Sequence, residues 1–243
     1  VILGPNASGK TTLLEAIYLL ATTTTPRGGR SRTAVRHGQA WGRVTGRFVV
    51  QGRDVTLRTT LGDPSGERTS ARTLEVDGRE VASAREIIGR VQAILFWVGE
   101  LDVVKGAPAD RRRFLNAALG QMSARYLDDL LRYRRALRQR NEVLKSLGRR
   151  EGDGRVLGPW THALVESGVP VALDRAAYLA ALAPEAAALH QRLGVGAEQL
   201  VVRYEPSVEP GEVDGELADE FYRRLEETHR GEVERGSTQV GPH

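Results

Sequence analysis

One motif governs the fold prediction for this chain: Gly4-Pro5-Asn6-Ala7-Ser8-Gly9-Lys10-Thr11. It matches the phosphate-binding pattern of a glycine, four residues and then Gly-Lys-Ser/Thr. Three apolar residues, 1–3, precede it, and apolar residues at helical spacing over 11–21 follow it. The pattern therefore predicts a strand, a glycine-rich loop and a helix, in the order that a phosphate-binding loop requires.

Each position of this motif has an expected role toward a nucleotide. Gly4 and Gly9 permit the backbone turns that aim N–H groups at phosphate oxygens, and the first turn of the following helix adds its positive end. Lys10 is expected to reach the β and γ phosphates, and the Thr11 hydroxyl to ligate Mg²⁺. We therefore expect ATP and Mg²⁺ as cofactors, with all eight residues from Gly4 to Thr11 around them.

Composition limits the class of protein. The 243 residues are 40% hydrophobic and 27% charged, which is ordinary globular usage. No run of about 18 apolar residues is present, so the sequence predicts no membrane span. The absence of cysteine excludes disulfides, thiolate zinc sites and cysteine nucleophiles, and is consistent with a cytoplasmic location. Because the chain starts at Val1 and runs at once into the loop, we expect a fragment of a longer protein.

The net charge of +4 is unevenly distributed along the chain. Residues 105–155 carry 14 Lys and Arg against 6 Asp and Glu, whereas residues 156–243 carry 7 against 15. A block of like charge raises the local potential and attracts phosphate. The middle of the chain is therefore a candidate for binding nucleic acid.

Periodicity divides the chain into three expected parts. The first, residues 1–104, is the beginning of an α/β lobe of the P-loop ABC-type ATPase class, a mixed sheet with an antiparallel meander. We expect strands at 42–50, 54–61 and 72–76 with turns at Gln51-Gly52, Asp63-Pro64 and Asp77-Gly78, a short helix near 83–89 and a buried strand at 91–98.

The second part, residues 105–198, is an inserted all-helical lobe with a hairpin tip near 148–158. Residues 199–243 are expected to return toward the ATPase lobe. We expect helices at 109–122, 123–147, 159–193 with a break near Gly168-Val169-Pro170, and 216–234, and strands at 200–204 and 237–240.

Arginines dominate the helical part. Three of them open one expected helix, and the surface of the next is expected to carry Arg125, Arg132, Arg134, Arg135, Arg138, Arg140 and Lys145. Arg134, Arg138 and Lys145 share one side of an expected helix, with Arg135 adjacent, and such a face can neutralise several DNA phosphates. An equally weighted alternative is a solvated face paired with Asp128, Asp129 and Glu142. The candidate DNA-binding residues are Arg30, Arg32, Arg111, Arg112, Arg113, Arg134 and Arg138.

Several segments together resemble the RecF family of bacterial recombination ATPases, relatives of the SMC class. The resemblance rests on the phosphate-binding motif and its continuation Leu13-Leu14-Glu15-Ala16-Ile17-Tyr18-Leu19-Leu20, on Val104-Lys105-Gly106-Ala107-Pro108-Ala109-Asp110-Arg111-Arg112-Arg113-Phe114-Leu115, and on Gly236-Ser237-Thr238-Gln239-Val240-Gly241-Pro242-His243. It departs at Phe96-Trp97-Val98-Gly99-Glu100, where the family usually has Phe-Ser-Pro-Glu-Asp. That departure leaves the role of this turn in coupling the lobes open.

The resemblance implies an ATP-dependent DNA-binding protein of recombinational gap repair and replication restart. Family members form ATP-dependent homodimers, bind DNA at single-strand/double-strand junctions, and act with RecO and RecR to promote RecA loading and the SOS response. Partners would be single-stranded and gapped duplex DNA, and no membrane. The resemblance also places the serine-rich signature and the magnesium-binding aspartate beyond residue 243, so we expect weak nucleotide binding and no hydrolysis by this chain, although the full-length family is a weak DNA-dependent ATPase.

Two other functions fit a phosphate-binding loop. One is a small-molecule P-loop kinase, in which the helical part is a lid and Arg111–Arg113 clamp the transferred phosphate. The other is a scaffold without catalysis, ordered by its nucleotide, whose acidic final part recruits a partner.

Overall fold

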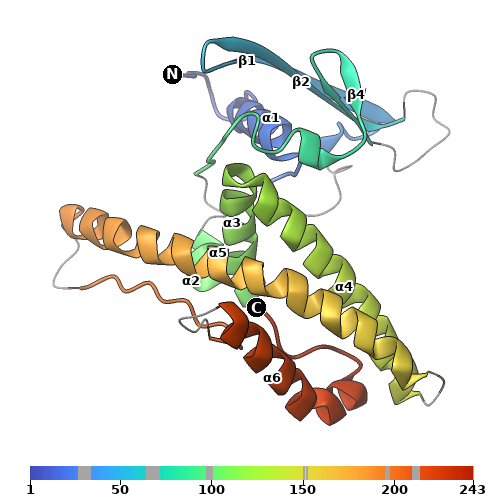
Figure 1. Cartoon of the computed structure of the whole chain (residues 1–243). Coiled ribbons are helices and arrows are strands. Elements are labelled where there is room, and N and C mark those ends of the chain that lie inside the picture. Colours follow the sequence, from blue (N-terminus) through green and yellow to red (C-terminus); the bar gives the residue numbers. More distant parts are fainter. Residues whose placement is uncertain are drawn as a thin grey trace. The chain divides into compact units, whose positions relative to one another are not determined.

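The computed structural model describes residues 1–26, 34–63, 72–96, 101–149, 151, 153–194, 198–209 and 214–242 (Figure 1). The chain divides into two compact units, Val1–Ala124 and Arg125–His243. The lobe boundaries expected at residues 104 and 198 are not the same as this division, and they remain a prediction about the ATPase as a whole. Arg30 and Arg32 lie outside the described residues, as do Trp97 and the three residues after it.

The first unit contains a helix and an antiparallel sheet. Helix α1 (Lys10–Thr22) is followed by a four-stranded sheet in the order β1-β2-β3-β4 (Figure 1). The predicted meander is confirmed, and β4 is an additional short strand. The strands are β1 (Trp41–Val50), β2 (Arg53–Gly62), β3 (Arg72–Val76) and β4 (Arg79–Val81).

Two-residue turns set the register of this sheet. Gln51-Gly52 and Asp77-Gly78 connect strands, so that Val50 pairs with Arg53 and Val76 with Arg79. Both residues of each turn have positive φ, between 49° and 80°. This is the conformation that matches the right-handed twist of a two-residue hairpin, and glycine at the second position adopts it without a steric penalty.

The core of the first unit forms where α1 meets the sheet. Leu20 of α1 packs with Leu57, Leu74 and Ile87. At Gly46 of β1, a Cβ atom would lie 2.6 Å from Leu20 Cδ1, so only glycine allows the helix to approach so closely. Burial of this apolar cluster holds the helix that begins at the glycine-rich loop against a rigid sheet.

Two strands expected in the first unit are not present. Residues 1–3 are exposed and pair with no other strand among the described residues. Residues 91–96 form no strand either, and Ile94 and Phe96 are 97% and 91% exposed. The Gln121 side chain accepts a hydrogen bond from Ala93 N (2.8 Å) and donates one to Ala93 O (3.2 Å), so a side chain replaces the neighbouring strand. The prediction of a buried strand was therefore wrong.

The remaining elements of the first unit are short except for one helix. A 3-10 turn (η2, Ala84–Glu86) lies within the predicted short helix, and α2 spans Asp102–Lys105. Helix α3 (Pro108–Met122) confirms the prediction for this segment. It begins with proline at its first turn, and the Asp110 carboxylate accepts a hydrogen bond from Ala107 N (2.9 Å), which caps the N-terminus.

The second unit is helical. Helix α4 (Ala124–Gly148) and helix α5 (Leu157–Arg192) are joined by a connection that contains η4 (Gly154–Val156), and α6 (Asp214–Arg235) follows (Figure 1). None of the described helices is long and apolar enough to cross a membrane. The helical character of this part is confirmed.

Helix α5 is continuous over 36 residues, so the break expected near residues 168–170 was wrong. Pro170 removes one intrahelical N–H but does not end the helix. Gly168 serves packing, because a Cβ atom there would lie 2.7 Å from Phe221 Cε1 and 3.3 Å from the Tyr133 ring. Sequence cannot distinguish a glycine that ends a helix from one that admits a neighbouring ring.

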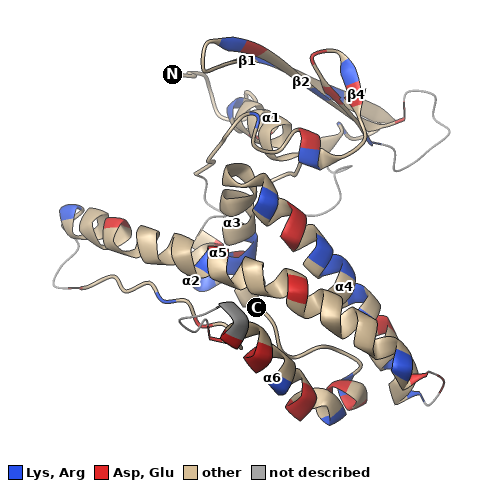
Figure 2. Ribbon diagram, in the orientation of Figure 1, with Lys and Arg blue, Asp and Glu red and all other residues tan. Residues whose placement is uncertain are grey.

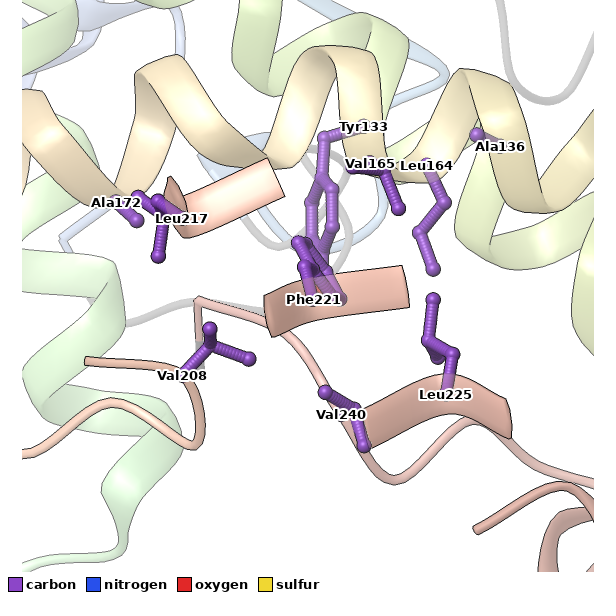
Figure 3. Close-up of a cluster of buried hydrophobic side chains, with 10 residues drawn as sticks. All are labelled: Tyr133, Ala136, Leu164, Val165, Ala172, Val208, Leu217, Phe221, Leu225 and Val240. Carbon is purple, nitrogen blue, oxygen red and sulfur yellow. The ribbon is translucent and has the colours of Figure 1, made fainter. Parts of the chain in front are cut away.

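Aromatic and aliphatic side chains from three helices form the core of the second unit (Figure 3). Tyr133 of α4 and Phe221 of α6 lie at its centre, and two residues outside the helices, Val208 and Val240, complete it. The strands expected at 200–204 and 237–240 are absent. In the second of these segments, Val240 is buried among the helices of the second unit and not in a sheet.

Candidate nucleotide-binding loop and arginine surfaces

The glycine-rich loop turns sharply and leads directly into α1. Ala7 and Gly9 adopt left-handed φ angles of 64° and 88°, and Ser8 N donates a hydrogen bond to Pro5 O (3.3 Å). Residues 4–9 are exposed, and the first turn of α1 contains no acidic residue. No carboxylate in this turn therefore neutralises the positive end of the helix dipole, which favours the binding of an anion at the loop.

Lys10 folds back over this loop. Its Nζ donates hydrogen bonds to Gly4 O (2.7 Å) and Pro5 O (2.6 Å). The ammonium charge and the N-terminus of α1 thus lie on the same short stretch of backbone. Their combined positive potential is suited to a polyphosphate, as the sequence predicts.

A magnesium ion fits this loop through a single protein ligand. Thr11 is exposed in the first turn of α1, and its hydroxyl is an oxygen donor of the kind that Mg²⁺ prefers. Mg²⁺ in nucleotide sites takes one or two protein ligands and completes its shell with phosphates and water. The described residues contain no cluster of His, Asp and Glu that would hold a metal without a nucleotide.

The arginines of α3 have local partners. Arg111 Nη1 donates to Gly106 O (3.1 Å), and Arg113 Nη2 lies 2.8 Å from Asp110 Oδ1. Arg112, between them, is half-buried. Contacts of these three residues with phosphate remain a prediction.

Basic residues recur along α4 (Figure 2), and some of them pair with acidic residues whereas others do not. Arg132 lies 3.9 Å from Asp129, and Lys145 lies 2.8 Å from Glu142, so part of the helix is the paired, solvated face that the alternative describes. Arg134, Arg135 and Arg138 are exposed and form no ion pair with any acidic residue in the described part of the chain. We call these three residues the arginine strip.

Arg140 differs from its neighbours and was missed by the sequence prediction. It was grouped with the surface arginines, but its side chain is 1% exposed and its Nη2 lies 2.7 Å from Glu232 Oε2. The available signal was spacing: residue 140 is seven after Tyr133 and four before Leu144, which are both buried. An arginine on the apolar side of a helix indicates a buried partner.

Comparison with known proteins identifies the family. A family model described as "AAA domain, putative AbiEii toxin, Type IV TA system" matches residues 1–233. The chain belongs to this AAA domain family. The nucleotide-binding class predicted from the loop is thereby confirmed, whereas the roles of its individual residues remain predictions.

The resemblance to RecF is confirmed by curated relatives. The chain is 36% identical over 245 residues to the DNA replication and repair protein RecF of Halalkalibacterium halodurans and 34% identical over 246 residues to that of Geobacillus kaustophilus. Each alignment includes 100% of this chain and 64% of the relative. The chain thus spans slightly less than two thirds of the length of these relatives.

Solved structures agree with the predicted fold class. The structure of the recombination mediator protein RecF-ATP in the RecFOR pathway matches with a TM-score of 0.88 and 27% identity, covering 98% of this chain and 63% of that one. The RecF-ATPrS structure matches with a TM-score of 0.86, 26% identity, and coverage of 99% and 64%. The α/β ATPase lobe with its helical part is therefore confirmed as the fold class.

Proposed function

We propose that this chain is the ATP- and DNA-binding part of a RecF-type protein of recombinational gap repair. The observation that carries the proposal is the loop with Lys10 folded over it at the positive end of α1, in a chain that matches RecF-ATP along 98% of its length. In this proposal Gly4–Gly9 wrap the phosphates, Lys10 binds the β and γ phosphates, and Thr11 ligates Mg²⁺.

DNA binding is proposed to use the arginine strip first. Its members have no acidic partner among the described residues, so phosphates do not need to displace one. Arg134 and Arg138 are four residues apart, or about 6 Å along a helix, which suits successive phosphates. Such contacts position a protein on DNA without reading its sequence. Arg30, Arg32 and Arg111–Arg113 are further candidates.

The cellular role follows from the relatives. RecF and the RecFOR pathway are the names carried by the matching proteins and structures. We propose that this protein acts with RecO and RecR type partners at single-strand/double-strand junctions, forms an ATP-dependent homodimer, and promotes RecA loading and the SOS response. For the 243-residue chain alone, we propose weak nucleotide binding without sustained hydrolysis.

The test measures binding of a gapped DNA duplex at two salt concentrations, with and without ATP and Mg²⁺. The measurement uses a chain extended to complete the ATPase lobe and compares it with its Lys10→Ala and Lys105→Ala variants. Lys105 is exposed and lies outside the loop, so it serves as the control. We expect steep salt dependence, tighter binding with ATP, and loss of the ATP effect in Lys10→Ala only.

Other outcomes support the alternatives. DNA binding that is indifferent to salt, to ATP and to Lys10 would contradict the proposal and favour the scaffold. Transfer of phosphate to a small molecule without DNA would favour the kinase.

A further inference from the structure

Residues 237–242 are bound in an unusual way. They form no strand, and the hydrogen bonds of their backbone go mainly to side chains from distant parts of the second unit. Ser207 Oγ donates to Gly241 O (2.6 Å) and accepts from Gly241 N (2.7 Å). Arg175 of α5 donates to Pro242 O. A segment without regular secondary structure is thus held mainly by side chains.

Two further side chains accept hydrogen bonds from backbone N–H groups of this segment. Asn141 Oδ1 of α4 accepts from Thr238 N (2.8 Å) and from Thr238 Oγ1 (2.7 Å). Glu232 Oε1 of α6 accepts from Gln239 N (2.7 Å). Backbone N–H groups ordinarily pair with backbone carbonyl groups, and here polar side chains, with Ser207 as the third, take that role.

A buried ion pair, Arg140 and Glu232, is connected to these contacts by hydrogen bonds. Arg140 Nη2 binds Glu232 Oε2 (2.7 Å), while its Nη1 donates to Thr238 Oγ1 (2.7 Å) and its Nε to Thr161 Oγ1 (3.1 Å). With Asn141, these residues form one connected network around Thr238. We call Arg140, Asn141 and Glu232, together with Thr238 and Gln239, the latch.

The latch shares α4 with the arginine strip. Asn141 follows Arg138 by three residues, which is about 4.5 Å along a helix. The same turn of α4 therefore carries an exposed cation, Arg138, that has no acidic partner among the described residues, and an acceptor for Thr238. A ligand that stiffens this turn would lower the entropic cost of the contacts that Asn141 makes with the segment.

We propose that the latch links DNA at the arginine strip to the order of residues 237–242. This rests on the proposed function, because it requires DNA phosphates on α4. DNA bound at Arg134 and Arg138 holds the latch closed. By thermodynamic reciprocity, opening the latch weakens DNA binding by the same factor.

The experiment measures amide hydrogen exchange of Thr238 and Gln239 in the 243-residue chain, with and without a gapped DNA duplex. Asn141→Ala removes the acceptor for Thr238. Ser146→Ala is the matched control, since it lies on the same helix and its hydroxyl donates a hydrogen bond within its own turn, to Val143 O, and has no other partner among the described residues. Thr238→Val keeps the shape of the side chain and removes its hydroxyl. This variant is a second way to weaken the latch, because the hydroxyl bonds to Arg140 and Asn141.

We expect DNA to slow exchange at both amides by about tenfold in the unaltered chain and in Ser146→Ala, within the range of ordinary coupling. In Asn141→Ala and Thr238→Val we expect fast exchange at both amides and a smaller slowing of that exchange by DNA. The affinity for DNA should fall by a factor similar to the loss of this slowing, and helix content should stay unchanged.

Salt-dependent DNA binding by the unaltered chain without any change in exchange would overturn the link and leave the proposed function standing. Exchange in Asn141→Ala and Thr238→Val that equals that of the control would also overturn it. Absence of DNA binding by the unaltered chain would overturn both this inference and the proposed function.

Discussion

Arg140 and Glu232 form an ion pair of 2.7 Å in which the two side chains are 1% and 0% exposed. Removing one partner leaves a charge in the interior without compensation, which costs about 3–5 kcal/mol. We expect Arg140→Ala to lower the free energy of unfolding of the second unit by this amount in urea titrations. The double variant Arg140→Met/Glu232→Leu should recover a large part of the loss, and a double variant as unstable as the single one would contradict this account.

Gly168 makes room for Phe221 and Tyr133 within the core of the second unit. In Gly168→Ala the new methyl group would meet the Phe221 ring at 2.7 Å, so we expect a loss of about 1–3 kcal/mol in stability. Gly158→Ala is the control on the same helix, because the added Cβ has no described atom within 4 Å apart from its chain neighbours and its own helix backbone. Urea titration of both variants checks the prediction, which fails if the two are equally stable.

Arg138 on α4 pairs with no acidic residue in the described part of the chain, whereas Arg132 on the same helix is paired with Asp129. If Arg138 binds a phosphate, Arg138→Gln should reduce the slope of log affinity against log salt by about 1. Arg132→Gln should change the slope less, because its charge is already partly neutralised. The measurement is duplex binding over a salt series, and equal slopes for the two variants would remove the arginine strip as the DNA surface.

Hydrogen bonds from Arg223 and then Arg224 lower the pKa of Glu220 to about 2. The ionised form of Glu220 is thus more stable in the folded chain than in the unfolded chain. Its contribution to the free energy of unfolding is complete above about pH 4.5, the ordinary pKa, and is lost as the pH falls toward 2. We expect the difference in stability between the unaltered chain and Glu220→Gln to shrink across this range. Glu216→Gln, on the same helix, is the control for removing one acidic side chain, and a difference that does not vary with pH would contradict the prediction.

Sequence predicted best those elements whose signals are local. The glycine-rich loop specifies both its own turn and the start of α1, and Gln51-Gly52 and Asp77-Gly78 specify the hairpins. Helices α3, α4 and α6 were also located from their periodicity to within two residues. In each case a few neighbouring residues determine the backbone conformation.

Sequence failed where the partner of a group is distant in the chain. The apolar run near Ala93 resembles a buried strand, and nothing local reveals that Gln121 takes the place of a neighbouring strand. The same holds for Thr238, whose acceptor is 97 residues away. Arg140 was assigned to the surface because charge usually indicates exposure, and its partner Glu232 is 92 residues distant.

The bonds from Lys10 to the carbonyl oxygens of Gly4 and Pro5 also affect which anions the loop selects. An incoming phosphate competes for the Lys10 ammonium with these two carbonyl oxygens. The net binding energy is therefore only the difference between the attraction of Lys10 to the phosphate and its attraction to the carbonyls. A singly or doubly charged anion gains little from this exchange, whereas the terminal phosphates of a nucleoside triphosphate gain more because they carry more charge. We therefore expect the loop to discriminate among ligands by the length of their phosphate chain, before any contact with base or sugar.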